Sequence, residues 1–373
     1  MQVDYRNDEF PSHYWRFFPG SIEAHPGDEI VFRQQWTGEP HTVTLGTVVD
    51  GSIPKVAALE KKYERYGDNP PADVASAAEK EFAEATKGLP LFDPYKDAAA
   101  QNAQQPCYLD TGAPSTDPNT PCPKTAQRQP EFTGRQTYYS SGFIAPSGAS
   151  GNTYRVKLAD SIKAGTYHFY CIVHHPYMQG EIVVKPKGAK VQSQSAVDRR
   201  ALAEINALSV PLKKAYSNVS KGTVTTSGST LRAPIAGFHS GEEFTVAVDA
   251  FVPKEVAAKV GRPVTWNILG AHTVSFGVPK YFPIYFVDAD GTVRRNPQVD
   301  RAAGGSPPAP PVDFLHPTYR VDGGTYSGQG FYSSGLLGSE PYSTYTLRFA
   351  RPGRYRYACL VHPAMVGFVV VTP

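Results

Sequence analysis

The sequence CIVHHPYM at residues 171–178 returns in a shorter form as CLVHPAM at residues 359–365. Each stretch places a cysteine, a histidine and a methionine in one short loop. Apart from Met1, the only methionines of this 373-residue chain are the two that close these loops. Thioethers confined to two such loops indicate metal ligands and not filler residues of a hydrophobic core.

A lone histidine precedes each loop in the same tripeptide, His-Thr-Val. Two histidines, a cysteine thiolate and a weak axial methionine sulfur form the ligand set of a blue-copper electron-transfer site. Thiolate and thioether favour Cu(I) and imidazole accommodates Cu(II), so one rigid geometry serves both oxidation states. The chain therefore has two candidate copper sites, the first with His41, Cys171 and Met178 and the second with His272, Cys359, His362 and Met365.

The second histidine ligand of the first site is either His174 or His175, because the first loop is one residue longer. The spacing from the cysteine matches His174 to His362, whereas the His-Pro-x-Met ending matches His175 to His362. We favour His174, because the turn after the cysteine must keep a backbone N–H pointed at the sulfur. The interval to the methionine can vary more, since the axial bond is long and weak. His175, with Pro176 and Tyr177, would then be part of a docking patch for a redox partner.

Other segments of the chain also occur twice, once in each half and in the same order relative to the cysteine loop. YYSSGFI at 138–144 and FYSSGLL at 331–337 precede the loops, and FFPGSIEAHPGDEIVF at 17–32 aligns with FVPKEVAAKVGRPVTW at 251–266. The chain also contains 34 Pro, 33 Gly and 22 Tyr, which favours strands joined by many turns. We predict an all-β fold of two tandem Greek-key β-sandwiches with small helical inserts.

The length of the chain favours two domains. We place the first at residues 1–190, with a helical and disulfide-containing insert at about 50–135. The second occupies residues 223–373, with a proline-rich insert at about 277–325. Residues 191–222 between them are predicted to form a helical linker.

The composition excludes several classes of partner. The net charge is only +3 and no run of like charge occurs, which argues against binding to nucleic acid. No stretch of apolar residues is long enough to span a bilayer. The first residues, MQVDYRNDEF, lack the charged and apolar regions of a secretory signal, so we interpret the sequence as a mature form with an added Met1.

Two further cysteines, Cys107 and Cys122, bound a segment rich in Pro, Thr and Asp. We predict a disulfide between them, which would stabilise the fold by about 3 kcal/mol for a loop of this length. Two free thiols are the alternative. A disulfide implies an oxidising, extracytoplasmic location, meaning periplasmic, cell-surface or secreted.

Both halves of the chain resemble cupredoxins, the superfamily of plastocyanin, azurin and amicyanin, and CLVHPAM is similar to the short amicyanin loop. The resemblance covers nearly the whole chain apart from the inserts and the linker. It implies two copper ions that alternate between Cu(I) and Cu(II), bound by the two ligand sets above. It also implies one-electron transfer to or from a redox partner protein or a small electron donor or acceptor. A homo-oligomer is compatible with this interpretation.

Other functions use the same ligands. An enzyme resembling two-domain nitrite reductases or laccases would need a further copper, connected by histidines beside the cysteine, but Tyr170 and Ala358 occupy those positions and no His-x-His occurs. Copper delivery or storage would be indicated by Met- or His-rich tracts, which are absent. We therefore expect an electron carrier without a catalytic copper cluster. The remaining histidines are interpreted as ordinary polar or surface residues: His13, His25, His168, His239 and His316.

Overall fold

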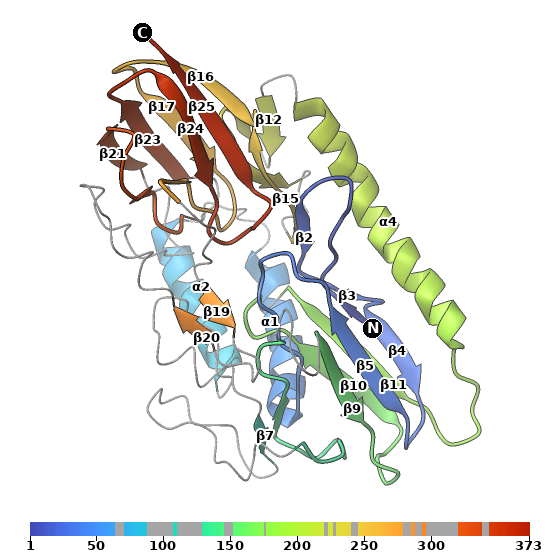
Figure 1. Cartoon of the computed structure of the whole chain (residues 1–373). Helices are drawn as coiled ribbons and strands as arrows, with labels where there is room; N and C mark the ends of the chain where they lie inside the picture. The colour runs from blue at the N-terminus through green and yellow to red at the C-terminus, as the bar shows by residue number, and fades with distance from the viewer. Residues whose placement is uncertain are drawn as a thin grey trace.

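The computed structural model describes the two halves of the chain as two β-sandwiches, with one long helix lying along both of them (Figure 1). The described residues are 1–63, 71–87, 107–109, 129–144, 152–174, 177–219, 223–226, 229–239, 245–278, 285–287, 293–295, 320–337 and 343–373.

The first sandwich is formed by two sheets. One has the order β3 (Phe17–Phe18), β1 (Gln2–Val3), β5 (Glu29–Gln34), β9 (Thr153–Lys157). The other has the order β4 (Ser21–Ala24), β11 (Gln179–Val184), β10 (Gly165–Tyr170), β6 (Thr44–Leu45), β8 (Tyr138–Ser140), β7 (Cys107–Leu109).

The second sandwich is also formed by two sheets. One has the order β2 (Ser12–Tyr14), β15 (Val246–Val252), β14 (Ile235–His239), β17 (Val264–Ile268), β23 (Ser343–Phe349), β21 (Arg320–Tyr326). The other has the order β16 (Glu255–Lys259), β25 (Val366–Thr372), β24 (Gly353–Ala358), β18 (Ser275–Phe276), β22 (Tyr332–Ser333). Two hairpins lie outside these sheets: β12 (Thr223–Thr226) with β13 (Ser229–Arg232), and β19 (Tyr285–Val287) with β20 (Val293–Arg295).

The two sandwiches share a common strand order, to which the first adds β7 and the second adds β2 and β21. The order β3-β1-β5-β9 matches β15-β14-β17-β23, and in both the middle pair is parallel while its neighbours are antiparallel. The order β4-β11-β10-β6-β8 matches β16-β25-β24-β18-β22, with a parallel first pair in each. The predicted all-β fold of two tandem sandwiches is therefore confirmed.

The strands alternate in burial as expected for sheets that pack one face on a core. In β25 the valines Val369 and Val371 are buried and their neighbours are half-buried or exposed. The fully buried Trp266 donates its indole N–H to the Tyr357 hydroxyl at 3.1 Å, which satisfies the indole inside the second core.

The N-terminal segment contributes to both sandwiches. Strand β2 pairs in antiparallel fashion with β15 of the second sandwich, while β1 and β3 pair within the first. The aromatic side chains of Phe10, Tyr14 and Phe18 share a buried cluster with residues of the second sandwich and of the long helix. A single apolar core thus crosses the boundary between the two sandwiches.

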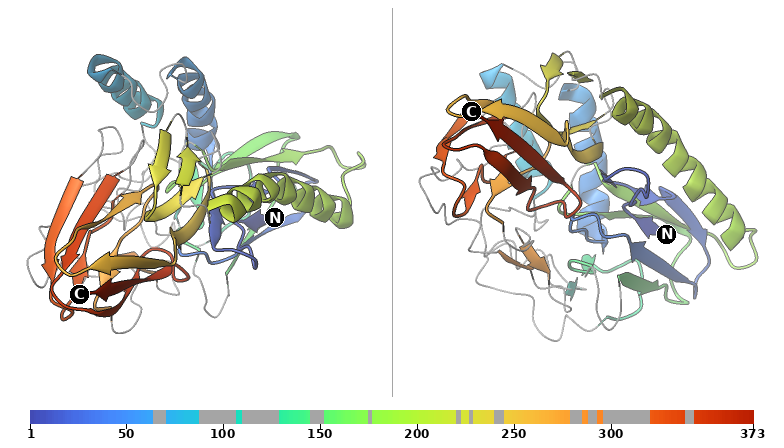
Figure 2. Two further views of the ribbon diagram at one scale, coloured as in Figure 1. Left: turned by 90° about the horizontal axis from the view of Figure 1, so that it is seen from above. Right: turned by 45° about the horizontal axis from the view of Figure 1, so that its top comes forward.

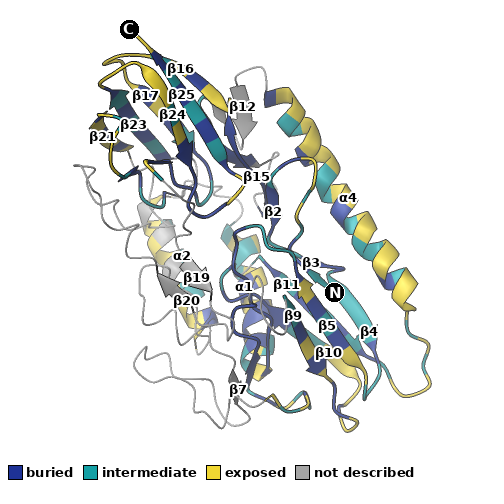
Figure 3. Cartoon of the chain, viewed as in Figure 1, coloured by how far each residue is buried: buried dark blue, intermediate teal, exposed yellow. Residues whose placement is uncertain are grey.

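The long helix α4 (Gln194–Asn218) is the predicted helical linker (Figure 1). The Ser193 side chain caps it by accepting a hydrogen bond from the backbone N–H of Ala196. The helix packs Ile205 and Leu212 onto the shared cluster, and its opposite face is exposed (Figure 3).

The predicted helical insert of the first sandwich contains α1 (Thr47–Tyr63) and α2 (Ala72–Ala85), which stand beside the sandwiches (Figure 2). Helix α1 packs Val49 and Ile53 against Tyr170 and Ile172, the two neighbours of Cys171. In the described part of the chain, no helix is long and apolar enough to cross a membrane.

Candidate metal centres

The first candidate site brings together three of its predicted ligands, His41 from one segment and Cys171 with His174 from one loop. The Sγ atom of Cys171 lies 3.9 Å from Nδ1 of His41 and 3.7 Å from Nδ1 of His174. The two Nδ1 atoms are 3.1 Å apart. All three side chains are buried, so their donor atoms face one another in a site closed to bulk water.

The second candidate site has almost the same dimensions. The Sγ atom of Cys359 lies 3.9 Å from Nδ1 of His272 and 3.8 Å from Nδ1 of His362. The two Nδ1 atoms are again 3.1 Å apart, and the three side chains are buried. Two segments that differ in sequence thus produce the same arrangement of one sulfur and two nitrogen atoms.

The loops that carry the cysteines close in the same way. The Cys171 N–H donates to the carbonyl of Met178 at 2.9 Å, and the Cys359 N–H donates to that of Met365 at 3.0 Å. Both methionines are buried at the base of their loops. The additional residue of the first loop lies between His174 and Met178, while the interval from cysteine to histidine is three residues in both loops.

In each His-Thr-Val tripeptide, the histidine is a candidate ligand and the threonine forms hydrogen bonds with the cysteine loop. The backbone N–H of Thr42 points at the Cys171 sulfur at 3.4 Å, and its hydroxyl accepts the N–H of Ile172 at 3.0 Å. Thr273 makes the equivalent contacts at 3.5 Å and 2.9 Å to the Cys359 loop. The threonine therefore joins the histidine strand to the cysteine loop in each sandwich.

The repeated Tyr-Ser-Ser-Gly segments brace the same tripeptides. The Ser141 hydroxyl accepts the backbone N–H of Val43, and the Ser334 hydroxyl accepts that of Val274, both at 2.9 Å. The second motif of the internal repeat therefore supports the strand that delivers the histidine.

Three of the four candidate ligand histidines donate a hydrogen bond from Nε2 to a carboxylate. His41 donates from Nε2 to Asp4 at 3.0 Å, His174 to one oxygen of Glu39 at 3.1 Å, and His362 to the other at 2.8 Å. An acceptor at Nε2 fixes the ring orientation and leaves Nδ1 as the lone-pair donor, which is the usual outer support of a metal-bound histidine. Within the described residues, Nε2 of His272 has no such acceptor.

Nε2 of His272 lies against the backbone of Gly237 and not against a carboxylate. Gly237 has a positive φ of 69°, and a Cβ atom there would lie 1.9 Å from Nε2 of His272. Only a residue without a side chain fits beneath this ring, so the two sites differ in their outer surroundings although their donor atoms match.

Burial and hydrogen bonding act in opposite directions on the ionisable groups. Burial raises the pKa of Cys171, but its two histidine partners hold that pKa well below the usual value of a thiol. Burial lowers the pKa of His41, but Asp4 and the cysteine raise it to about 10. Burial and the charge of His362 lower the pKa of His272 to about 3. A metal binds the thiolate and the neutral imidazole, so metal binding at the first site would release the proton that His41 holds.

The donor set fits a copper ion. A triangle with one side of 3.1 Å and two of 3.7–3.9 Å has its centre about 2 Å from each corner, close to the metal–ligand bonds of about 2.0–2.1 Å to nitrogen and about 2.3 Å to thiolate that zinc forms in proteins. Two imidazoles and one thiolate, with a buried methionine in the loop of each cysteine, match the preferences of blue copper.

Several functional residues were missed or misjudged from the sequence. His13 was predicted to be an ordinary polar or surface residue, but it is buried between the sandwiches, where its Nδ1 lies 2.8 Å from Asp249. This prediction is wrong because strand β2 carries His13 into the second sandwich. Glu39 and Asp4 carry no motif that would have indicated their contacts, although Glu39 lies only two residues before His41.

Other predictions fall outside the described residues. His175 and Pro176 are among these, so the structure places only His174 of the two alternatives. The predicted disulfide also lies outside, because Cys122 is not described.

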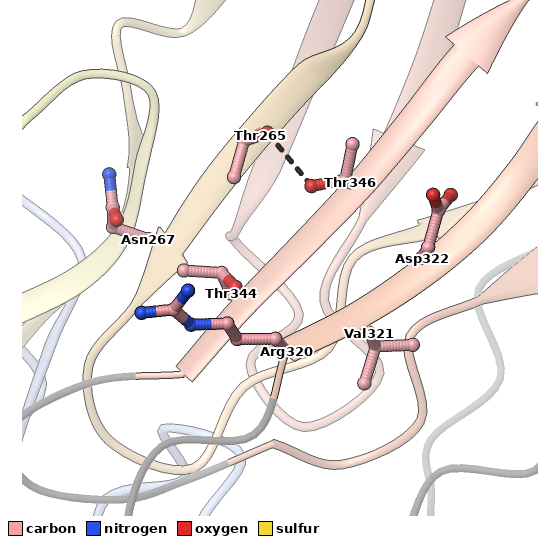
Figure 4. Close-up of a pocket in the computed structure, with 7 residues that line it drawn as sticks. All are labelled: Thr265, Asn267, Arg320, Val321, Asp322, Thr344 and Thr346. Carbon is pink, nitrogen blue, oxygen red and sulfur yellow. Dashed lines mark hydrogen bonds between the residues drawn. The ribbon is translucent and has the colours of Figure 1, made fainter.

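A surface cavity of about 360 Å³ lies on the outer face of the sheet formed by β17, β23 and β21. Figure 4 shows its lining, in which the hydroxyls of Thr265 and Thr346 are 2.8 Å apart. None of the proposed ligands borders this cavity, whose lining residues are Thr265, Asn267, Arg320, Val321, Asp322, Thr344 and Thr346.

The strand order of each half and the twin clusters define a two-domain protein of cupredoxin-like fold. Neither a protein-family model nor a curated protein matches the chain. Solved structures of amicyanin mutants do match, among them two Cu(I) forms, one of them at pH 4, and one oxidised form. These three are 23% identical, cover 33% of this chain and 73% of theirs, and have a TM-score of 0.18.

Proposed function

We propose that this protein is an electron carrier with two blue-copper sites. The first site would be formed by His41, Cys171, His174 and Met178, and the second by His272, Cys359, His362 and Met365. The observation that carries the proposal is the duplicated set of two Nδ1 atoms and one Sγ atom with nearly equal separations.

The buried surroundings also support electron transfer. When bound, copper supplies a one-electron redox couple. The protein holds its ligands on strands and tight loops within packed cores, so little rearrangement accompanies a change of oxidation state. We further propose an extracytoplasmic location and a redox partner protein or small molecule that exchanges electrons with the sites.

The proposal is tested by counting bound copper in the purified protein and recording its visible spectrum. The wild type is expected to bind two copper ions, each with an intense thiolate-to-copper charge-transfer band. Cys171→Ser and Cys359→Ser should each remove one ion and part of the absorbance, because serine offers no thiolate. The two variants are matched controls for each other, since each retains one complete site.

An unchanged copper count in Cys171→Ser would contradict the first site, and an unchanged count in Cys359→Ser would contradict the second. Copper bound without the charge-transfer band in the wild type would contradict blue-copper coordination at both.

A further inference from the structure

One buried side chain joins the two candidate sites. Glu39 belongs to the first sandwich, and each of its carboxylate oxygens accepts a hydrogen bond from a histidine of a different site. The bond from Nε2 of His174 is 3.1 Å long, and that from Nε2 of His362 is 2.8 Å long. Only two hydrogen bonds and one carboxylate therefore separate the ligand rings of the two sites, although 323 residues separate Glu39 from His362 in the chain.

The chemistry of this bridge depends on a carboxylate. Both histidines turn Nδ1 toward their own cysteine, so both have an N–H at Nε2 to donate. A carboxylate can accept two such bonds, one on each oxygen, whereas an amide has one acceptor oxygen and one donor nitrogen. The bonds from two histidines hold the pKa of the buried Glu39 well below its usual value, although burial alone raises it.

A stack of aromatic rings runs between the same two histidines. Trp15 lies against His174 with ring centroids 4.7 Å apart and planes inclined by 16°. His13 lies 5.2 Å from Trp15, and His362 lies 5.4 Å from His13, with inclinations of 18° and 12°. The hydrogen bond from His13 to Asp249 keeps the stack in place at the boundary between the sandwiches.

We propose that the Glu39 carboxylate is an electron relay between the two copper sites, so that the protein exchanges electrons internally as well as with its partners. This inference rests on the proposed function. With copper bound, one electron would pass between the site of His174 and the site of His362, so that one site would be oxidised as the other is reduced. Both hydrogen bonds to Glu39 stay intact, and no proton or atom is transferred.

The test is the reaction of the doubly oxidised, two-copper protein with a pulse that delivers less than one electron per molecule. Absorbance changes are assigned to each site with the one-copper variants Cys171→Ser and Cys359→Ser. The wild type should show a second phase whose rate is independent of protein concentration, and both one-copper variants should lack it.

Glu39→Gln should slow this phase about tenfold or more, which is the usual size of an effect at an outer-shell partner. Glu39→Asp should do the same, because its charge is kept while the shorter side chain cannot reach both histidines. The matched control is Glu23→Gln on β4, where the glutamate forms an ion pair with Lys185 and takes no part in either site. That variant should keep the wild-type rate.

A second readout does not depend on electron transfer. In the fully reduced, diamagnetic protein, the Nε2–H signals of His174 and His362 should be protected from solvent exchange, and Glu39→Gln should expose one of them. If Glu39→Gln fails to bind two copper ions, Glu39→Asp serves for both measurements.

Three results would overturn the relay. The first is a two-copper wild type without a concentration-independent phase. The second is a phase that is unchanged in the Glu39 variants but lost in Trp15→Leu, which would assign the path to the ring stack. The third is a further metal ion bound by His13, Asp249 and His362, whose ligand atoms also lie close together. A wild type that binds fewer than two copper ions would instead contradict the proposed function.

Discussion

Asp4 distinguishes the two sites at the scale of single residues. It is fully buried and accepts hydrogen bonds from the backbone N–H groups of Tyr5 and Tyr14, from the Thr37 hydroxyl and from His41. A buried negative charge beside a ligand stabilises the more positive oxidation state of a metal. His272 in the second site has no carboxylate at Nε2 in the described part of the chain, whereas Asp249 lies 3.5 Å from Nε2 of His362, so each site has a carboxylate of its own and Asp4 should lower the reduction potential of the first site alone.

Asp4→Asn removes this charge and keeps the shape of the side chain. We expect the reduction potential of the first site to rise by something on the order of 60 mV, equivalent to a tenfold change in a one-electron equilibrium. The second site should keep its potential. A redox titration that follows the band of each site measures both values, and Asp160→Asn, at an exposed position, is the control. Equal shifts at both sites would contradict a local effect of Asp4.

At the scale of elements, helix α4 connects the sandwiches in sequence and also packs against their shared apolar cluster. Its buried face carries Leu212, which packs into the cluster shared by the N-terminal segment and the second sandwich. The exposed face carries Leu202, which is 54% exposed. Because both residues are leucines in one helix, replacing each by alanine changes the helix propensity equally. The difference between the two effects on stability then measures the packing of Leu212.

Leu212→Ala should lower the free energy of unfolding by about 2–5 kcal/mol, because it leaves a cavity in a packed core. Leu202→Ala should change it by no more than about 0.5 kcal/mol, as is usual for an exposed position. Urea denaturation of the two copper-free variants gives both values. Equal effects would show that α4 is held by its own propensity and not by the shared core.

At the scale of the whole molecule, the N-terminal segment, helix α4 and one apolar cluster connect the two sandwiches. Strand β2 leaves the N-terminal segment to pair with β15, and the same exchange carries His13 and Trp15 between the two sites. The pairing of β2 with β15 therefore places the two sites near each other and also contributes residues to the shared apolar cluster.

We expect the copper-free protein to unfold in one cooperative transition. Separate unfolding of either sandwich would expose the shared cluster around Tyr14 and Leu212, which costs free energy in both halves. Calorimetry should show a single peak whose calorimetric and van't Hoff enthalpies agree. Two resolved peaks would show that the sandwiches are independent domains.

The ligand loops could be predicted from the sequence because their chemistry is local. Cys171 and Met178, like Cys359 and Met365, are brought together by one short turn, and the tripeptides at His41 and His272 repeat the rest of each site. The same repeats, with alternating strand patterns, predicted two sandwiches, which the strand order confirms. Local spacing also favoured His174, and the structure places its Nδ1 beside the cysteine.

Only the tertiary structure decided how the two sites are related. Glu39 reaches His362 across 323 residues and His13 reaches Asp249 across 236 residues, and neither contact leaves a periodic or motif signal in the chain. Such pairs depend on which strands join which sheet, and β2 joins the sandwich that follows it in the chain. Ligand geometry follows from short loops, whereas the connection between the sites follows from the packing of the whole molecule.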